Sequence, residues 1–374
     1  MTNDVDPLVI GGGLAGSMLA LRLAAANRRV TLLEKESSPH HKVCGEFLSP
    51  EAVHYLHQAG IDPVQLGAAT IRALRLSAGS RVVEAALPFS ALSLSRKTLD
   101  EALLSRAAAT PGCTVLRGSP VETVKLNGHS ATAQLRGGQS FTAPAVFLAT
   151  GKHDVRAWHR SPSKQSDMVG FKIHLQLDPA QTEALRGFIE IFLFPHGYGG
   201  ISLVEGDAAN LCFVVRRSAL RIQAGFDAIL ANILQHNQHL RQRLQKATPL
   251  WDRPLAISPI PYGYLAKHPR GLWSLGDQAA VIPSFTGDGM SIALHSAALA
   301  AKMYLAGETA DTYHRILRAQ LNRGMMLATL VSRLIVTSPA LALAPIVLSF
   351  IPPVIKQIAA NTRIPRQVLL TTET

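Results

Sequence analysis

The chain opens on Pro7-Leu8-Val9-Ile10-Gly11-Gly12-Gly13-Leu14-Ala15-Gly16, an apolar run that passes into glycines and then into the helix-forming residues 17–26. This order predicts a strand, a tight turn and a helix. Gly11 permits the turn, Gly13 lets the backbone approach a pyrophosphate, and Gly16 lets the helix pack closely on the strand. The amides and the positive dipole at the start of such a helix attract phosphate. The stretch therefore predicts a dinucleotide-binding α/β domain.

A second apolar run supports this interpretation. Residues 30–33 end at Glu34, about 20 residues after the glycines, where a carboxylate can accept hydrogen bonds from both hydroxyls of an adenosine ribose. The alternative, a glycine-rich turn without a ligand, has to explain three glycines and an acid in this register by chance. The predicted cofactor contacts at the front of the chain are Gly11, Gly13, Leu14, Ala15, Gly16, Glu34 and Lys35.

The composition is that of a globular protein. The chain has 374 residues, of which 47% are hydrophobic, and this length predicts about two domains. There are 37 Lys and Arg residues against 25 Asp and Glu, a formal net charge of +12. The excess favours anionic partners such as a phosphate-bearing cofactor, an acidic lipid surface, an acyl carrier or nucleic acid. Because the basic residues are scattered and not interleaved with aromatics, we do not expect nucleic-acid binding.

The three cysteines, Cys44, Cys113 and Cys212, are far apart and contain no C-x-x-C pair. This predicts neither a disulfide framework nor a zinc site, and we expect no bound metal. Free thiols are typical of a reducing compartment. The first apolar run is already the predicted strand and lacks the flanks of a signal peptide. We therefore expect a cytoplasmic protein.

One late segment departs from this picture. Residues 334–355 contain no charged residue and are long enough to span a bilayer. Prolines inside a helix cost about 3 kcal/mol each, and here they favour two short helices. Three alternatives stay open: a packed helical cap, peripheral contact with a membrane surface, and a true span. The prolines are Pro339, Pro345, Pro352 and Pro353.

The order of predicted strands and helices indicates a discontinuous α/β architecture. A Rossmann-type domain is predicted from segments 1–70, 95–160 and 265–310. An antiparallel, substrate-binding sheet domain is interleaved with it over 71–94 and 161–264, and a helical segment follows over 311–374. Two local predictions are a small antiparallel meander over 114–117, 121–126 and 131–135, and one amphipathic helix over 226–246.

A second glycine-rich motif lies late in the chain. It consists of Gly276-Asp277-Gln278-Ala279, Pro283 and Thr286-Gly287-Asp288-Gly289-Met290. Together with the opening motif, it resembles the FAD-dependent oxidoreductases that group geranylgeranyl reductases with aromatic-hydroxylase-type monooxygenases. The resemblance extends to about Leu305 and implies that FAD is the cofactor.

The resemblance also implies roles for particular residues. Asp277 is expected to contact the ribityl chain, residues 287–290 the isoalloxazine edge, and Arg96 the FAD backbone. The start of a helix after this turn would favour the negative charge of a reduced flavin. The implied late cofactor contacts are Gly276, Asp277, Gly287, Asp288, Gly289 and Met290.

The loop around Val43-Cys44-Gly45-Glu46 is similar to the flavin-side loop of geranylgeranyl reductases. Cys44 is a candidate proton donor or pocket residue, although buried thiols often act only as small hydrophobes. Glu46 is a candidate general acid or base, or else a backbone cap. Both are our candidate catalytic residues.

Two motifs depart from the family pattern. In Phe194-Pro195-His196-Gly197-Tyr198-Gly199-Gly200, glycine stands where the reductases have tryptophan, and we take His196 and Tyr198 as candidate substrate contacts or surface residues. The hydroxylases' middle motif is altered over residues 149–156, so NADPH docking there is not implied. The W-x-W-x-I-P pattern of flavin halogenases is absent, since each of the three tryptophans stands alone.

These observations predict an FAD-dependent oxidoreductase acting on a hydrophobic, lipid-like or polyketide-like small molecule, with NAD(P)H or a partner reductase as electron donor. Our first expectation is a monooxygenase, because the reductases' aromatic motif is missing. The alternative is a geranylgeranyl-reductase-like enzyme that reduces carbon–carbon double bonds, which Cys44-Gly45 favours. The alternative of another class is an FAD-containing protein that binds RNA or a membrane surface.

Overall fold

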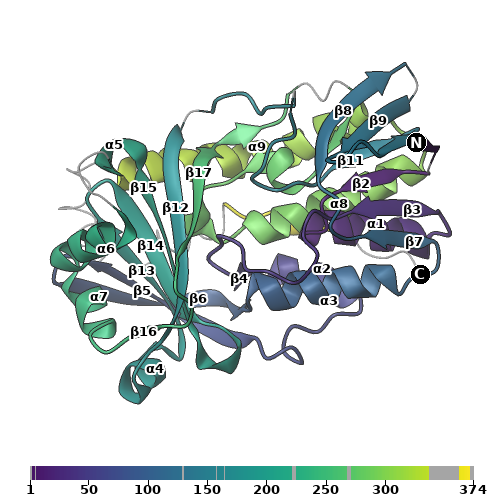
Figure 1. The fold of residues 1–374 in the computed structure, drawn as a ribbon. Helices are drawn as coiled ribbons and strands as arrows, with labels where there is room; N and C mark the ends of the chain where they lie inside the picture. The colour runs from purple at the N-terminus through teal and green to yellow at the C-terminus, as the bar shows by residue number, and fades with distance from the viewer. Residues whose placement is uncertain are drawn as a thin grey trace.

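The computed structural model of the chain describes residues 2–4, 6–128, 130–156, 158–163, 165–220, 225–267, 271–336 and 362–370. Figure 1 shows two halves: one built on the strand and glycine turn that open the chain, the other on a large sheet. We call them the glycine-turn half and the large-sheet half. The mixed α/β fold agrees with the prediction.

The glycine-turn half is centred on a five-stranded parallel sheet in the order β19-β11-β2-β3-β7. Several of its strands are buried along their whole length, as expected for a parallel sheet covered on both faces. The strands are β2 (Leu8–Ile10), β3 (Val30–Leu33), β7 (Cys113–Leu116), β11 (Val146–Leu148) and β19 (Trp273–Ser274).

Helices pack on this sheet from segments far apart in the chain. Helix α1 (Leu14–Ala25) contacts both α3 (Arg96–Ala108) and α8 (Gly289–Leu305). The close packing of α1 on β2 requires glycine, because a Cβ at Gly16 would lie 1.8 Å from the carbonyl oxygen of Gly11. Helix α2 (Pro50–Gln58) begins after Ser49, whose side chain accepts the Ala52 amide, and packs on α8.

A small sheet in the order β1-β10-β9-β8 packs on the face of the parallel sheet opposite these helices. One local prediction was wrong here: the segment predicted as 114–117 is β7, which pairs in parallel with β3 and does not join the antiparallel meander. The strands of the small sheet are β1 (Thr2–Asp4), β8 (Val121–Asn127), β9 (Ser130–Leu135) and β10 (Ser140–Ala143).

The large-sheet half is a nine-stranded sheet in the order β16-β12-β15-β14-β13-β5-β6-β4, with β17 also pairing β12. Most pairs are antiparallel, but β13 and β5 run parallel. The strands are β4 (Phe47–Leu48), β5 (Ala69–Ala78), β6 (Arg81–Ser93), β12 (Gln165–Gln176), β13 (Gly187–Phe194), β14 (Gly197–Leu203), β15 (Ala209–Arg216), β16 (Thr248–Pro249) and β17 (Leu255–Tyr262).

One face of this sheet is covered by short helices, which lie on the outer side in Figure 1. The helix predicted over 226–246 is divided in two, because the Asn237 side chain accepts from the Leu240 amide and starts a new helix. The helices of this half are α4 (Pro179–Leu185), α5 (Arg217–Leu220), α6 (Gly225–His236) and α7 (Gln238–Arg243).

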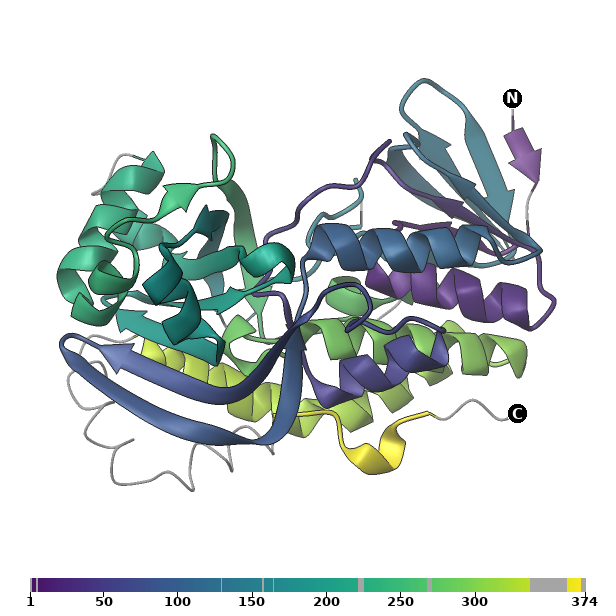
Figure 2. The ribbon, with the colours of Figure 1, turned by 90° about the horizontal axis from the view of Figure 1, so that it is seen from below.

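The other face of the large sheet meets the glycine-turn half. Helix α9 (Ala310–Ile335) connects the two: it starts beside β19 and ends among apolar side chains of the sheet (Figure 2). No helix among the described residues is long and apolar enough to cross a membrane. The remaining elements are β18 (Tyr264–Leu265), β20 (Ala280–Val281), and the 3-10 turns η1 (Glu205–Asp207), η2 (Gly276–Gln278), η3 (Ser284–Thr286) and η4 (Arg366–Val368).

The structure leaves part of the late apolar segment undescribed. Residues 337–361 lie outside the described residues, and they include most of the segment 334–355 for which we predicted a helical cap or membrane contact. That expectation stays a prediction.

Candidate functional site

The glycine turn lies between β2 and α1, at the carboxyl end of the parallel sheet. Gly11 has a positive φ of 106°, and a Cβ there would lie 2.5 Å from the carbonyl oxygen of Ala149, so only glycine fits. The buried carboxylate of Glu34, at the end of β3, accepts the Gly12 amide at 2.6 Å and the Glu36 amide at 2.9 Å. The acid predicted to bind a ribose thus lies directly beside the turn.

Two cations lie over this turn. A Cβ added to Gly13 would be 3.4 Å from Lys42 Nζ and 3.6 Å from Arg96 Nη2. Both cations also pair with one carboxylate, Asp100: Arg96 Nε donates to Oδ1 at 2.7 Å and Lys42 Nζ to Oδ2 at 2.8 Å. Burial raises the pKa of Asp100, but the charges of Arg96 and Lys42 outweigh it, so the pKa is lowered and the group stays ionised.

A third cation, Lys152, follows β11 and pairs with the late motif. Lys152 Nζ donates to Asp277 Oδ2 at 3.0 Å, and Asp277 follows β19 on the turn η2. Burial would raise the pKa of Asp277, yet the charge of Lys152 lowers it. Among the described residues, Lys42, Arg96 and Lys152 pair with Asp100 and Asp277, and these cations and the amides of the turn together offer donors to an anion such as a diphosphate.

The second glycine turn comes just before α8. Gly287 has a φ of 74°, and Phe47 lies where its Cβ would be. Around Gly289, by contrast, a Cβ would meet nothing within 4 Å, so there is room at the start of the helix. Asp288 between them is buried, and both its carboxylate oxygens lack a hydrogen-bond partner among the described residues. Burial raises the pKa of Asp288 to about 7.

The loop before β4 carries the two candidate catalytic residues. Cys44 is half-buried; its Sγ accepts the Glu46 amide at 3.3 Å, and its carbonyl oxygen accepts Asn210 Nδ2 at 3.2 Å. Around the adjacent Gly45 a Cβ would meet nothing within 4 Å. Glu46 is fully buried and has a φ of 59°, a left-handed conformation that a non-glycine residue rarely adopts.

The Glu46 carboxylate connects this loop to the large sheet. It accepts hydrogen bonds from Lys172 Nζ, from the Arg96 amide at 2.7 Å and from His174 Nε2 at 2.8 Å. Lys172 and His174 alternate along β12 and point to the same face. Burial would raise the pKa of Glu46, but the hydrogen bond from His174 and the charge of Lys172 outweigh it, so the pKa is lowered. Glu46 is therefore a carboxylate at neutral pH.

His41 completes this cluster. Its ring centroid lies 4.9 Å from that of His174 and 4.4 Å from that of Trp251. His41, Glu46 and His174 offer possible ligand atoms within 4.8 Å of one another. The arrangement is nevertheless unsuited to a metal ion, because the Lys172 ammonium already lies on the same carboxylate and would repel a dication.

The same face of the sheet becomes apolar toward α9. Tyr198 Oη and Tyr262 Oη lie 3.2 Å and 2.8 Å from Ser284 Oγ, which stands at the start of the turn η3. The surrounding buried side chains include Met168, Leu193, Val214, Ile260 and Val336. Phe285, next to Ser284, packs against this cluster and also against the core of the glycine-turn half. The apolar surface is thus continuous with the second glycine turn.

Comparisons with known proteins agree with this geometry. Residues 4–149 match a family model described as an FAD binding domain. A menaquinone reductase of Mycobacterium tuberculosis is 26% identical over 354 residues, covering 87% of this chain and 83% of that protein. The chain therefore carries an FAD-binding domain over residues 4–149 and is an FAD-dependent enzyme.

Two further likenesses extend this result. A squalene epoxidase of Schizosaccharomyces pombe is 35% identical over 60 residues, 16% of this chain and 13% of that protein. A solved geranylgeranyl bacteriochlorophyll reductase-like protein of Thermoplasma acidophilum covers 99% of this chain and 95% of its own, with a TM-score of 0.73 and 18% identity. The second likeness shows the fold alone.

The residues described above fit FAD. The glycine turn with Lys42 and Arg96 suits the diphosphate, Glu34 the adenosine ribose, and Asp277 the ribityl hydroxyls. The open space at Gly45 and Gly289 leaves room for a ring system between the loop and α8. When bound, FAD supplies the hydride chemistry that protein side chains lack.

The structure brings most of the predicted site residues together, with two exceptions in position. Lys35 is exposed and pairs with Glu36 at 3.4 Å. His196 is exposed at the turn between β13 and β14, whereas Tyr198, two residues later, is buried on the face that meets the glycine-turn half. Their roles as cofactor or substrate contacts stay predictions.

Several residues of the site were missed by sequence reasoning. Lys42, Asp100 and Lys152 carry no local pattern, because their partners are distant in the chain. Lys172 and His174 did carry a signal: within the apolar run of β12 they are polar at a spacing of two, which places both on one face. A charged residue at such a position is seldom buried without a specific partner.

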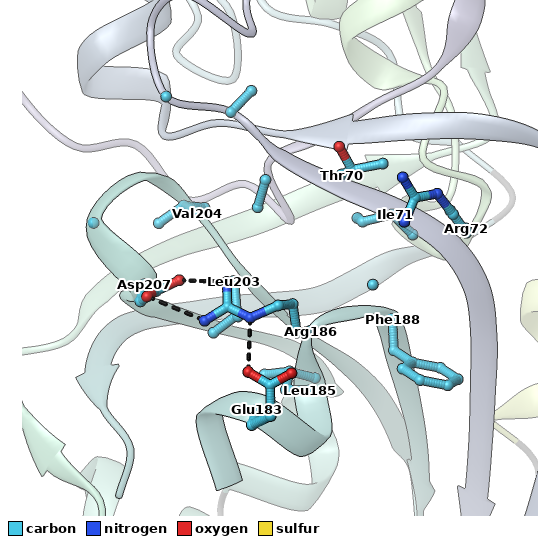
Figure 3. Close-up of a pocket in the computed structure, with 15 residues that line it drawn as sticks. Thr70, Ile71, Arg72, Glu183, Leu185, Arg186, Phe188, Leu203, Val204 and Asp207 are labelled. Carbon is cyan, nitrogen blue, oxygen red and sulfur yellow. Dashed lines mark hydrogen bonds and ion pairs between the residues drawn. The ribbon is translucent and has the colours of Figure 1, made fainter. Parts of the chain in front are cut away.

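One cavity lies apart from this site. It has a volume of about 540 Å³, and its lining includes Thr70, Arg72, Phe188 and Val204 (Figure 3). Arg186 at its rim pairs with Glu183 and Asp207, all on the surface. No predicted site residue lines it, so we assign it no part in the chemistry.

Proposed function

We propose that the protein reduces a carbon–carbon double bond of an apolar isoprenoid-type molecule, and that menaquinones are the first substrate class to test. The observation that carries this proposal is the extent of the likeness to menaquinone reductase. Because it covers 87% of the chain, it must continue beyond residues 4–149 into the large-sheet half, where a substrate would be recognised.

The geometry supports an apolar substrate. The apolar part of the large sheet adjoins the second glycine turn, so a hydrophobic molecule placed there would lie against the FAD site. Only a few polar groups interrupt this surface, chiefly the hydroxyls of Tyr198, Tyr262 and Ser284. Such a surface with a few convergent polar groups is typical of small-molecule sites.

The reaction needs a hydride and a proton. FAD provides the hydride, after reduction by NAD(P)H or by a partner reductase. The protein must provide the proton and exclude water from the reacting carbons. Cys44 on the loop and Lys172 on the sheet carry protons beside the FAD site, and the Glu46 carboxylate between them can accept and pass on a proton.

A monooxygenase remains the second candidate. It is favoured by the short likeness to squalene epoxidase and by Gly200, which stands where geranylgeranyl reductases have tryptophan. The likeness covers only 16% of this chain, so it carries less weight than the near-complete match to menaquinone reductase.

The test is a reaction with a short-chain menaquinone, run first without air and then with air. We expect a product that has gained two hydrogen atoms without air and keeps them after the quinol ring is reoxidised in air. Gain of one oxygen atom only in air would establish the monooxygenase instead. No turnover across a broad lipid panel, together with tight binding to RNA or anionic vesicles, would favour a binding protein and refute both enzymes.

A further inference from the structure

Lys172 is a buried ammonium with too few hydrogen-bond partners. Its side chain is 0% exposed, and among the described residues it has one partner, the Glu46 carboxylate. An ammonium carries three N–H donors. Two donors are therefore left without an acceptor in the part of the chain that the structure describes, which is costly in a buried place unless another group accepts them.

Two more unpaired polar atoms lie in the same place. Asn210 Oδ1 and His41 Nδ1 are buried and have no hydrogen-bond partner in the described part of the chain. Asn210 stands opposite His174 in the β12–β15 pairing, and Cys212 opposite Lys172. The polar end of this sheet face thus holds unused donors and acceptors around a well-paired carboxylate, an arrangement suited to exchange of protons with water or a ligand.

The cluster also has a direction, from the surface inward. His41 is half-buried on the loop before β4, His174 is buried on β12, and Glu46 and Lys172 are fully buried. Burial and the charge of Lys172 lower the pKa of His41 to about 4, so its ring is neutral near pH 7 and can take a proton on one nitrogen while giving one from the other.

We propose that His41, His174 and Glu46 form a proton path from solvent to Lys172, and that Lys172 gives the proton in the reduction. This rests on the proposed function. In each turnover, a Lys172 N–H bond breaks as its proton joins one carbon of the double bond; FAD, when bound and reduced, would supply the hydride to the other carbon. The Glu46 carboxylate then accepts a proton from His174 and passes it to neutral Lys172, and His174 regains a proton from solvent through His41. One solvent proton is consumed, and the four residues end unchanged.

The molecule offers a matched control on the opposite face of the same sheet. There His239 Nε2 lies 3.1 Å from the buried carboxylate of Glu190, much as His174 lies 2.8 Å from Glu46. His239→Gln removes a histidine from a buried carboxylate without touching the proposed path. This control therefore measures how much the loss of a histidine beside a buried carboxylate changes the protein through packing alone.

The test uses the FAD-loaded protein with Lys172→Met, His174→Gln, His41→Gly and the control His239→Gln. The first readout needs no substrate: bound flavin is reduced without air by light and an added sacrificial electron donor, and a pH-indicator dye follows the uptake of protons. We expect Lys172→Met and His174→Gln to slow this uptake at least tenfold, and His239→Gln to match the wild type. Uptake at the wild-type rate in both path variants would overturn the proposal.

The second readout is single-turnover reduction of the menaquinone probe in H₂O and in D₂O. We expect a slow step with an increased solvent isotope effect in the path variants. We also expect free imidazole to restore the rate of His41→Gly, because that position is reached from the surface. Loss of rate without rescue would mean a structural role and refute the path. If the wild type does not reduce the probe at all, the proposed function fails while proton uptake still tests the path.

Discussion

Two buried glutamates on opposite faces of the large sheet have different surroundings. Glu190 faces the outer helices, where Arg75, Arg243 and His239 hold it, and none of these four side chains leaves a buried polar atom unpaired among the described residues. Glu46 faces the glycine-turn half, where Lys172 keeps two unused donors. From this difference we infer that burial of a charged group alone does not indicate a functional site. Unpaired hydrogen-bond donors and acceptors around the buried group do indicate one.

The largest expected loss of stability comes from a substitution on the outer face of the large sheet. Glu190→Gln leaves two buried guanidinium groups without their shared carboxylate, and we expect the free energy of unfolding to fall by about 3–5 kcal/mol. Urea unfolding monitored by circular dichroism measures this. Turnover per folded molecule should equal that of the wild type. Folded Glu190→Gln protein with impaired turnover would contradict the assignment of a structural role to this face.

The acid sensitivity of the same group follows from its pKa, which is lowered to about 2 from an ordinary value of 4.5. Burial would raise this pKa, but the hydrogen bonds from His239 and Arg243 outweigh it. A lowered pKa gives stability that is complete above about pH 4.5 and is lost as the pH falls toward 2, here about 3 kcal/mol. We therefore expect the difference in the free energy of unfolding between the wild type and Glu190→Gln to shrink as the pH falls from 4.5 to 2, which urea unfolding at several pH values measures. A difference in unfolding free energy that does not change with pH would contradict the lowered pKa of Glu190.

Asp288 extends the comparison to a carboxylate that lacks partners. Its pKa is raised to about 7, so the stability that comes from holding a proton is present below about pH 4 and is lost as the pH rises through 7. Asp288→Asn should therefore stabilise the FAD-free protein at pH 8 by about 4 kcal/mol and leave it unchanged near pH 4. Thermal unfolding at the two pH values measures this. Equal stability at pH 8 would show that the carboxylate is paired.

The smallest expected changes in stability come from two neighbouring glycines of β14, Gly199 and Gly200, whose Cα atoms face opposite sides of the sheet. A Cβ at Gly199 would lie 2.2 Å from the Phe192 ring, so Gly199→Ala should lower stability by about 1–3 kcal/mol. A Cβ at Gly200 would meet its nearest atoms at 3.6 Å, an ordinary contact, so Gly200→Ala should stay within about 0.5 kcal/mol. Equal losses in urea unfolding would mean that both faces are equally tightly packed.

Much of the fold could be predicted because it is encoded locally. The glycine turn, the acid after β3 and the serine-capped starts of α2 and α3 each lie within a short run of sequence. The prediction that β7 joins an antiparallel meander was wrong, because the sequence of a short strand does not indicate whether the neighbouring strand runs parallel or antiparallel. The break at Asn237 was missed because the amphipathic pattern continues across it.

The candidate site could be predicted only in part, for a related reason. Its backbone positions belong to motifs, but its charges are paired over long distances: Glu46 and Lys172 are 126 residues apart. No local sequence pattern predicts a pairing over such a distance. The alternation of Lys172 and His174 in an apolar strand indicated which face they share, but not that the loop at Glu46 would cover them.

The parallel sheet of the glycine-turn half is completed by β19, which pairs with β11 across a sequence gap filled by most of the large sheet. During synthesis on a ribosome, the opening turn emerges first, but Asp277 and the start of α8 emerge only after the strands of the other half. With Asp277 and α8 as the residues we expect to hold FAD, the site is complete only after these late segments are made, and we expect a product truncated before them to be colourless.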